Sequence, residues 1–456
     1  MPDFSPCFKA YDIRGKAPHE LNASFSYALG LALADHYPPA AVVLGHDVRK
    51  SSPGLHNALA SALAARGAKV STLGLCGTEE IYYASANSDN DLGIMVTGSH
   101  NPIDENGFKL VRRGSVPISQ DSGLREIALK TAEYLRKPRP DELNHPELTH
   151  LDIREKWLDW LLGYARISRP DARKQKVVID AGNGCAGPVL EALAPRLPVQ
   201  IIPLNFKPDG SFPNGVPNPL LPERRRTAAK AVLENRADLG IAFDGDFDRC
   251  FFFNHRGEFV ETCYLAGLLA SQLLMAHPAE KIIHDSRVYW NTRDLVYTAG
   301  GLPQISRSGH AFMKETLRRE NALYGAEMSG HHFYRDFAYS DSGILTMLLV
   351  LALLLRSGQT LAELVEAGES AYPCSGEVNF RVDNAGRVLD AVWEKYRREA
   401  LAMDRLDGIN IEYPGWRFNL RASNTEQLLR LNIESRGDAK LIKKKLAELS
   451  RFIANA

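Results

Sequence analysis

A surplus of charge of either sign is absent from the sequence. Its 55 Lys and Arg residues balance 55 Asp and Glu residues, so the formal net charge at pH 7 is zero. Without a global basic field, nothing favours binding to nucleic acid or to an anionic membrane surface. We therefore expect neither partner, and any anion-binding site must be built locally.

Paired cysteines are absent as well. The chain has no CxxC pair, and its six cysteines are scattered at Cys7, Cys76, Cys185, Cys250, Cys263 and Cys374. Such spacing suggests neither a disulfide framework nor a zinc cluster. Reduced thiols in the cytoplasm fit this pattern better.

Long hydrophobic runs are also missing. The N-terminal stretch MPDFSPCFKAYDIRG has no apolar signal core. The longest apolar run, GILTMLLVLALLL at residues 343–355, is shorter than the ~20 residues that a membrane helix needs. We predict that this run forms a buried core helix of a cytoplasmic protein.

What the sequence does contain is an internal repeat. Three times a short β-branched run ends on an aspartate, in AVVLGHDVR, KVVIDAGNG and KIIHDSRV (residues 41–49, 176–184 and 281–288). Each is followed by a second strand-like run that leads into an unusual loop, in DLGIMVTGSHNP, DLGIAFDGDFDR and ALYGAEMSGHHF (residues 91–102, 238–249 and 322–333). Helical stretches such as GLHNALASALAARG and PVLEALAPRL lie between them, and this alternation predicts α/β units.

The repeat predicts the fold class. A chain of 456 residues is about three times the ~150 residues of a typical domain. We expect an α/β fold with three similar mixed-sheet α/β domains, at residues 1–142, 143–254 and 255–369, and a smaller C-terminal α+β domain at residues 370–456. Ligands usually bind at strand ends in such sheets, so the loops are expected to surround a central cleft. A stretch of linker composition at residues 135–148 separates the first two domains.

The strongest chemical signal is FDGDFDRC, in which Asp244, Asp246 and Asp248 alternate. Side chains at positions i, i+2 and i+4 of an extended segment point the same way, so three carboxylates can close on one ion. Oxygen-only ligands suit Mg²⁺ or Mn²⁺. An EF-hand is excluded, because Arg249 stands where it needs Gly and His255 where it needs Glu. Two alternatives stay open: a solvated acidic turn, and a phosphatase with Asp244 as nucleophile and Asp246 as acid/base.

A glycine motif is less informative. GNGCAG at residues 182–187 matches G-x-G-x-x-G and follows a strand-like run. A dinucleotide site also needs an acidic residue at the end of the next strand, about 20 residues on. Asp209 has roughly that spacing but lies in a proline-rich loop. We therefore interpret the glycines as a tight strand-to-helix turn.

Ser99 stands where the strand-like run MVTGSHNP breaks. A hydrolase elbow, G-x-S-x-G, would need glycines where Thr97 and Asn101 stand, so that interpretation fails. A helix cap is the plainest alternative. If Ser99 instead carries a phosphoryl group, it gains about −1.5 to −2 charges facing three aspartates. A divalent metal between them resolves that clash and acts as a Lewis acid in phosphoryl transfer.

These motifs resemble those of an α-D-phosphohexomutase, most closely the bacterial phosphomannomutase/phosphoglucomutase branch. The resemblance runs from FKAYDIRG through TGSHNP, DGDFDR and GAEMSGHHF to RASNTE, and it covers essentially the whole chain. Four loops in this order, one per domain, make it specific. Departures are minor: Ala326 takes a position that is usually Gly, and Gln427 one that is usually Pro.

The resemblance implies a role for each loop. Ser99, in the first domain, is phosphorylated in the resting enzyme and contributes a metal ligand beside the Mg²⁺-binding Asp244, Asp246 and Asp248 of the second. The sugar-binding loop of the third domain carries Glu327 and Ser329. The phosphate that is not transferred is gripped in the fourth domain by Arg421, Ser423, Asn424 and Thr425. By their own chemistry these last residues make an anion cradle, although an ordinary polar hairpin turn is the alternative.

Further site residues follow from the same resemblance. Those with catalytic roles besides Ser99 are His100, Lys109, Arg14, Arg249 and His331, and those that bind substrate also include Tyr11 and His310. Lys109, His331 or Arg14 would serve in proton transfer at the sugar hydroxyl.

The resemblance thus implies an intramolecular phosphotransferase that interconverts hexose 1-phosphate and hexose 6-phosphate, of mannose and glucose. The cofactors are Mg²⁺ and hexose 1,6-bisphosphate, which is both intermediate and activator. Because O3 and O4 are equatorial in both sugars and exchange places when the ring flips, Glu327 and Ser329 can hold either orientation. We expect a monomer whose partners are small-molecule hexose phosphates. A phosphoglucosamine mutase, a Mg-dependent phosphatase using Asp244 and a non-catalytic sugar-phosphate sensor stay open as alternatives.

Overall fold

The computed structural model describes residues 5–137, 146–167, 175–423 and 428–456. Contacts divide the chain into two compact units. Unit 1 is Met1–Phe259 with Asp336–Gly358, and unit 2 is Val260–Arg335 with Gln359–Ala456. The chain therefore passes from one unit to the other three times.

The first sheet of unit 1 is mixed. Its strands are β1 (Ile13–Lys16), β2 (Ala41–His46), β3 (Lys69–Leu75), β4 (Leu92–Val96), β5 (Glu105–Arg112), β6 (Val116–Pro117) and β7 (Thr149–His150). They lie in the order β1-β5-β4-β2-β3-β7, with β6 paired to β5. β2 pairs in parallel with β3 and β4, whereas β5 runs antiparallel to β4. The accompanying helices are α1 (Ala23–His36), α2 (Ser52–Ala65), α3 (Thr78–Asn87) and α4 (Arg125–Leu135).

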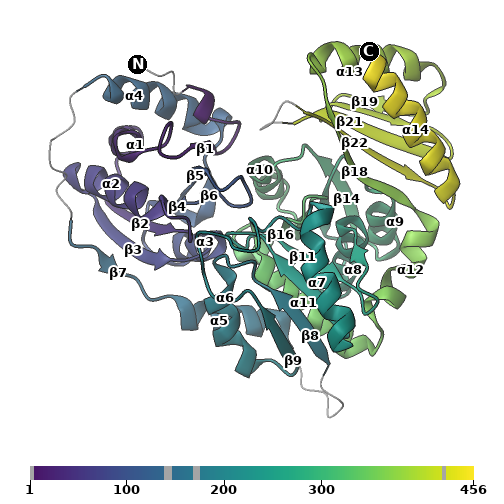
Figure 1. Cartoon of the computed structure of the whole chain (residues 1–456), viewed down its shortest axis with the longest axis horizontal. Coiled ribbons are helices and arrows are strands. Elements are labelled where there is room, and N and C mark those ends of the chain that lie inside the picture. The colour runs from purple at the N-terminus through teal and green to yellow at the C-terminus, as the bar shows by residue number, and fades with distance from the viewer. Residues whose placement is uncertain (1–4, 138–145, 168–174, 424–427) are drawn as a thin grey trace. The chain divides into compact units, whose positions relative to one another are not determined.

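The core of this part follows from apolar spacing. Leu29 and Leu33 of α1, four residues apart, lie on one face of that helix. They join Leu59 and Leu63 of α2 in one buried cluster with residues of β2, β4 and β5. Figure 1 shows these elements in the purple and blue part of the ribbon.

The second sheet of unit 1 repeats the arrangement. Its strands are β8 (Lys176–Asp180), β9 (Gln200–Leu204), β10 (Leu239–Phe243), β11 (Cys250–Phe253) and β12 (Phe259–Val260), and its helices are α5 (Arg154–Ala165), α6 (Ala186–Leu193) and α7 (Pro222–Asn235). β10 pairs in parallel with β8 and antiparallel with β11. GNGCAG forms the turn from β8 to α6: Gly182 has a φ of 58°, and a Cβ on Gly187 would lie 1.7 Å from the Phe206 carbonyl oxygen. The predicted strand-to-helix turn is confirmed.

The longest apolar run forms α11 (Gly343–Ser357), preceded by β17 (Ser340–Asp341), and both belong to unit 1. Most of the α11 side chains are buried, and the helix packs on α5 and β11, so the predicted core helix is confirmed. Among the described residues, no single helix is long and apolar enough to cross a membrane. α11 and α12 (Leu361–Ala371) pass that test by length and composition when they are counted together.

Unit 2 contains two sheets of different kinds. The mixed sheet has β13 (Lys281–Asp285), β14 (Leu302–Ser306), β15 (Tyr324–Ala326) and β16 (His332–Tyr334), with helices α8 (Thr262–Ala276), α9 (Trp290–Thr298) and α10 (His310–Glu320). The other sheet is antiparallel, in the order β18-β22-β21-β20-β19. Its strands are β18 (Cys374–Arg381), β19 (Ala402–Asp404), β20 (Ile409–Glu412), β21 (Trp416–Ala422) and β22 (Leu428–Ser435). α13 (Ala385–Tyr396) and α14 (Ala439–Asn455) pack on it (Figure 1).

The three mixed sheets share one strand–turn–strand connection, which positions the candidate site. In each sheet, a strand that pairs in parallel on one side is connected by a turn to an antiparallel neighbour on its other side. These pairs are β4 and β5, β10 and β11, and β15 and β16. The loops singled out by the sequence repeat occupy these three equivalent turns. The predicted fold class, three mixed-sheet α/β domains followed by a smaller α+β domain, is confirmed.

Candidate active site

Ser99 lies in the turn between β4 and β5, where two residues that follow β2 hold it. Asp47 accepts hydrogen bonds from the Thr97 hydroxyl at 2.9 Å and from the Gly98 amide at 3.0 Å. The Arg49 guanidinium donates to the Ser99 carbonyl oxygen at 2.9 Å and to three further carbonyls of the same turn. Ser99 is buried and has a left-handed φ of 47°. This Asp–Arg clamp therefore fixes a backbone shape that a serine rarely adopts.

The same clamp recurs in unit 2, at Asp285 and Arg287. Asp285 accepts from the Met328 amide at 2.8 Å, and its other oxygen accepts from the Arg287 amide at 3.1 Å. The Arg287 side chain lies 3.5 Å from Ser329 Oγ, in the turn that follows β15. The two clamps come from HDVR (46–49) and HDSR (284–287), at matching places in the repeat. The sequence prediction noted the aspartates that end these strands but missed the arginines, although the shared HDxR spacing is a signal for both.

Asp244, Asp246 and Asp248 follow β10 and are buried, each at most 1% exposed. One carboxylate oxygen from each lies within 4.8 Å of the others. The extended geometry assumed for them is wrong, because residues 244–249 form a turn in which Phe247 has a φ of 48°. The carboxylates converge because the chain turns around them, not because alternate side chains of a strand share a face.

Two cationic side chains offset part of the negative charge of this acidic turn. Lys109 Nζ donates to Asp246 Oδ2 at 2.8 Å and also to Asp248. Arg249 donates to Asp244 Oδ2 at 3.0 Å from Nε and at 2.7 Å from Nη2. Burial alone would raise the pKa of Asp246, but the charge and hydrogen bond of Lys109 bring it far below its ordinary value. Burial raises the pKa of Asp244 to about 6, although the Arg249 charge opposes this shift.

The Ser99 hydroxyl faces the acidic turn. Its Oγ lies 3.0 Å from Asp244 Oδ2 and 3.1 Å from His100 Nδ1. Arg249 Nη2 also contacts that ring nitrogen, which must then act as an acceptor. Burial and the Arg249 charge hold the pKa of His100 well below its usual value, so the imidazole is neutral at pH 7.

The remaining predicted residues of unit 1 lie close by. Arg14, on β1, is buried, pairs with Asp12 at 2.8 Å and donates to the Thr97 carbonyl oxygen at 2.5 Å, so it is joined to the Ser99 turn. Tyr11 precedes β1 and is partly buried. Unit 1 thus brings together Ser99, His100, Lys109, Arg249 and the three aspartates, with Arg14 beside them.

The acidic turn fits a divalent cation. Asp246 Oδ1 is buried and has no hydrogen-bond partner among the described residues, whereas Oδ2 is held by Lys109 and Thr78. The potential metal ligands of the triad are all carboxylate oxygens, with no nitrogen or sulfur ligand among them. Oxygen ligands of this kind suit Mg²⁺ or Mn²⁺. The triad is therefore a site that could hold a metal ion.

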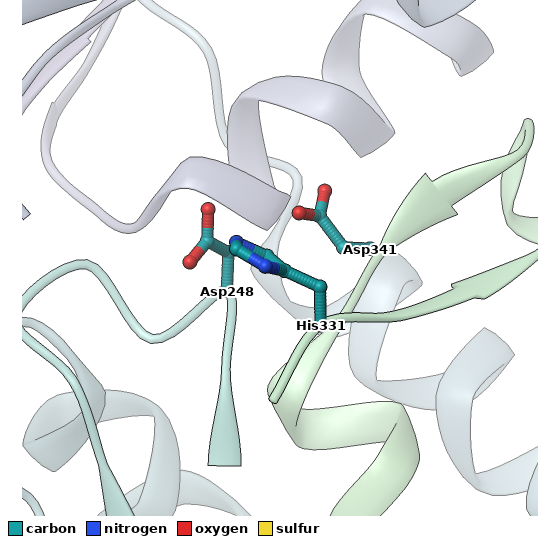
Figure 2. A group of neighbouring side chains, drawn as sticks. All are labelled: Asp248, His331 and Asp341. Carbon is teal, nitrogen blue, oxygen red and sulfur yellow. The ribbon is translucent and has the colours of Figure 1, made fainter. Parts of the chain in front are cut away.

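Asp341 is a further acidic residue beside the triad, which the sequence patterns missed. It lies on β17, is fully buried, and offers an oxygen within 4.8 Å of one from Asp248. Figure 2 shows both carboxylates; His331, also labelled there, belongs to unit 2. A fourth carboxylate adds to the negative charge that a cation would neutralise.

In unit 2, the turn after β15 gathers the residues expected to bind sugar. Glu327 accepts from the Gly309 amide at 2.5 Å and from the Ser329 hydroxyl at 3.3 Å. His331 Nδ1 lies 3.1 Å from Glu327 Oε2. Burial alone would raise the pKa of Glu327, but the hydrogen bond and charge of His331 lower it to about 2. The ring of His310, the first residue of α10, lies 6.0 Å from that of His331.

Arginines gather at the end of β21, where anion binding was expected. Arg421, Arg430 and Arg287 surround the Glu377 carboxylate at 3.6, 3.1 and 3.5 Å. Burial and the neighbouring Arg287 charge lower the pKa of Arg421, and its buried Nε has no hydrogen-bond partner among the residues described. Three guanidinium groups around one carboxylate favour an anion.

Not every predicted phosphate-binding residue can be placed. Ser423 follows β21, and its amide donates to the Leu428 carbonyl oxygen at 2.8 Å. Asn424 and Thr425 lie outside the described residues.

Four family models match the chain in order. They are described as phosphoglucomutase/phosphomannomutase, alpha/beta/alpha domains I, II and III, which match residues 5–135, 155–257 and 263–372, and the C-terminal domain, which matches residues 377–451.

Individual proteins match over nearly their whole length. One named "Phosphohexose mutases" from Xanthomonas campestris pv. campestris is 49% identical over 448 residues, 98% of this chain and 99% of the relative. A phosphomannomutase of Escherichia coli K12 is 48% identical over 441 residues, 96% of each chain. A solved phosphoglucomutase/phosphomannomutase family protein from Burkholderia thailandensis has a TM-score of 0.86 at 30% identity, over 100% of this chain and 98% of the other.

Proposed function

Because the chain belongs to the phosphoglucomutase/phosphomannomutase family and is a hexose phosphate mutase, we propose that it works through a phosphoserine at Ser99 and a hexose 1,6-bisphosphate. The observation that carries this proposal is the position of the Ser99 hydroxyl, 3.0 Å from Asp244 and fixed by the Asp–Arg clamp. A phosphoryl group there is adjacent to the carboxylates that would hold Mg²⁺. The ion would act as a Lewis acid and offset the added negative charge.

The proposed reaction has two balanced transfers. In the first, the bond between Ser99 Oγ and phosphorus breaks and the phosphoryl group joins O6 of a hexose 1-phosphate. O6 loses its proton, and Ser99 Oγ takes one up to become a free hydroxyl. In the second, the bond between O1 of the bisphosphate and phosphorus breaks and the phosphoryl group joins Ser99 Oγ. The Ser99 hydroxyl loses its proton, and O1 takes one up. Hexose 6-phosphate is released, and the phosphoserine is restored.

Residues of unit 2 would orient the substrate in both transfers. Glu327 and Ser329 provide an acceptor and a donor for two equatorial sugar hydroxyls. Arg421, whose buried Nε has no hydrogen-bond partner in the described part of the chain, would hold the phosphate that is not being transferred. Asn424 and Thr425 keep the roles predicted for them from the sequence.

The proton carrier is best assigned to His331 among the three candidates. Lys109 is bound to Asp246 and Asp248 as a cation, and Arg14 is bound to Asp12 in the same way. Neither then offers a lone pair to a sugar hydroxyl. His331 is an imidazole, a side chain that takes up and releases protons readily near neutral pH, and Glu327 orients its ring.

The phosphatase alternative, with Asp244 as nucleophile, is less favoured. Asp244 Oδ2 accepts hydrogen bonds from Ser99 and twice from Arg249, which reduces its nucleophilicity and access.

The sugar is proposed to be mannose, since several relatives are named phosphomannomutase, with glucose accepted as well. Glucosamine 1-phosphate is the alternative substrate. A monomeric, cytoplasmic enzyme stays a prediction.

Intact-mass measurement and peptide mapping of the isolated protein test for a phosphoryl group on Ser99. The mutase activity of Ser99→Ala is compared with that of a control, Ser211→Ala, which changes an exposed loop. We expect a phosphoryl group at Ser99 and loss of mutase activity in Ser99→Ala alone. Full activity in that variant would refute the proposal, and phosphate release without isomerised sugar would favour the phosphatase. Mutase activity measured side by side on mannose, glucose and glucosamine 1-phosphates identifies the preferred sugar.

A further inference from the structure

The first turn of α3 contacts the acidic turn at two points within unit 1. The Thr78 hydroxyl donates to Asp246 Oδ2 at 2.5 Å, and the Thr78 amide donates to the Asp246 carbonyl oxygen at 3.1 Å. Thr78 itself is fully buried. Because the second contact is made by the backbone, a substitution of the Thr78 side chain removes the first and retains the second.

Packing holds the acidic turn against this helix. A Cβ on Gly77 would lie 2.0 Å from the Phe247 ring, so α3 approaches the turn as closely as a glycine permits. The Phe247 ring is buried and stacks on Trp157 of α5, with ring centroids 6.3 Å apart. The turn cannot slide along α3 without unpacking this ring, and the Thr78 hydroxyl keeps a fixed position relative to Asp246.

The two oxygens of Asp246 have unequal surroundings. Oδ2 accepts from the Thr78 hydroxyl and from Lys109 Nζ, and its acceptor capacity is largely used. Oδ1 is buried and accepts no hydrogen bond from the described residues, while one carboxylate oxygen each from Asp244, Asp246 and Asp248 lies within 4.8 Å of the others. Hydrogen bonds to one oxygen of a carboxylate restrict rotation of the group and thereby fix the direction of the other oxygen.

We propose that Thr78 is a positioning residue for Asp246: its hydroxyl holds Oδ2 so that Oδ1 is presented to a divalent cation in the acidic turn. The inference rests on the proposed metal role of the triad and adds a residue to which no role had been assigned. Partners that hydrogen-bond a metal ligand typically contribute 10-fold to 100-fold in metal affinity. A neutral hydroxyl does this without adding positive charge beside the ion, unlike Lys109.

Mn²⁺ binding to the metal-free, full-length protein tests the proposal, with the dissociation constant measured by electron paramagnetic resonance. Thr78→Val keeps the shape and removes the hydroxyl, Thr78→Ser keeps the hydroxyl, and Asp246→Asn is the reference for a lost ligand. We expect about 10-fold to 100-fold weaker binding in Thr78→Val and a change below about 3-fold in Thr78→Ser. Near-ultraviolet circular dichroism checks the fold, and Thr78→Ala replaces Thr78→Val if the latter is misfolded.

Activity gives a second readout. In Thr78→Val, the Mg²⁺ concentration needed for half-maximal activity should rise by the same factor, while the rate at saturating Mg²⁺ stays close to that of the parent. Binding within 2-fold of the parent in Thr78→Val, when Asp246→Asn has lost it, overturns the role of Thr78 and leaves the metal site standing. Unchanged Mn²⁺ binding in Asp246→Asn would instead overturn the proposed metal role of the triad.

Discussion

At the scale of single residues, Lys109 is the countercharge of Asp246 and Asp248, and we expect its contribution to stability to depend on whether a metal ion is bound. Lys109→Met leaves Asp246 and Asp248 as buried carboxylates without their cation, and removal of one partner from a buried pair costs about 3–5 kcal/mol. We expect a lower unfolding free energy in chelator and a substantial recovery when Mn²⁺ is added. Urea denaturation with and without Mn²⁺ measures both effects. Lys230→Met, from an exposed pair with Glu234, is the control and should cost under about 1 kcal/mol.

Glu79 makes stability depend on pH. It is fully buried on α3, where it accepts from the Ser342 hydroxyl and from the Ile344 amide at 3.0 Å. Burial raises its pKa well above the unfolded value of about 4.5, so its contribution to stability is present at low pH and is lost as pH rises toward the raised value. Glu79→Gln keeps an acceptor and removes the titration.

We expect the parent to be most stable relative to Glu79→Gln near pH 5, with this advantage shrinking as pH rises to 8. Unfolding free energies from urea titrations at several pH values measure the difference. An advantage of the parent that grows with pH would contradict a raised pKa at Glu79.

At the scale of elements, the junction of α11 with the acidic turn is sterically tight. A Cβ on Gly343 would lie 2.5 Å from the Phe247 carbonyl oxygen and 3.0 Å from the Arg249 carbonyl carbon. We expect Gly343→Ala to lower the unfolding free energy by about 1–3 kcal/mol, because backbone must move. Gly163→Ala, on the exposed face of α5 with nothing within 4 Å, should raise it by about 0.5–1 kcal/mol. Stabilisation by both changes would refute the close approach at Gly343.

The sequence repeat predicted elements better than it predicted contacts. Runs of β-branched residues and the shared DLGI placed the strands, and the loops at their ends came from the same pattern. The hydrogen bonds on Asp246 come from Lys109 and Thr78, which stand 137 and 168 residues away along the chain. Periodicity carries no information about such pairs, so Thr78, Arg287 and Asp341 were missed, although the repeated HDxR spacing is a signal for Arg287.

At the scale of the whole molecule, the predicted mutase function is confirmed, and the proposed metal and phosphate sites fall in different units. We expect Mn²⁺ alone to slow amide hydrogen exchange in residues 97–104 and 244–249 of unit 1. Inorganic phosphate alone should slow it in residues 286–289 and 417–423 of unit 2. Protection of the opposite unit by either ion would contradict these assignments. Sodium chloride at equal ionic strength separates general salt effects from specific binding.

The passage of residues 336–358 back into unit 1 bears on how the protein is made. When synthesis reaches residue 259, the surfaces of α5 and β11 that receive α11 are still open. At ~5–20 residues per second, α11 arrives on the order of 5–20 s later, after most of the mixed sheet of unit 2 has been translated. A nascent chain arrested before residue 343 should be degraded by added protease in its first half, whereas one arrested well beyond residue 358 should resist. The order of translation thus leaves the unit that carries Ser99 and the acidic turn to be finished by a helix encoded far downstream.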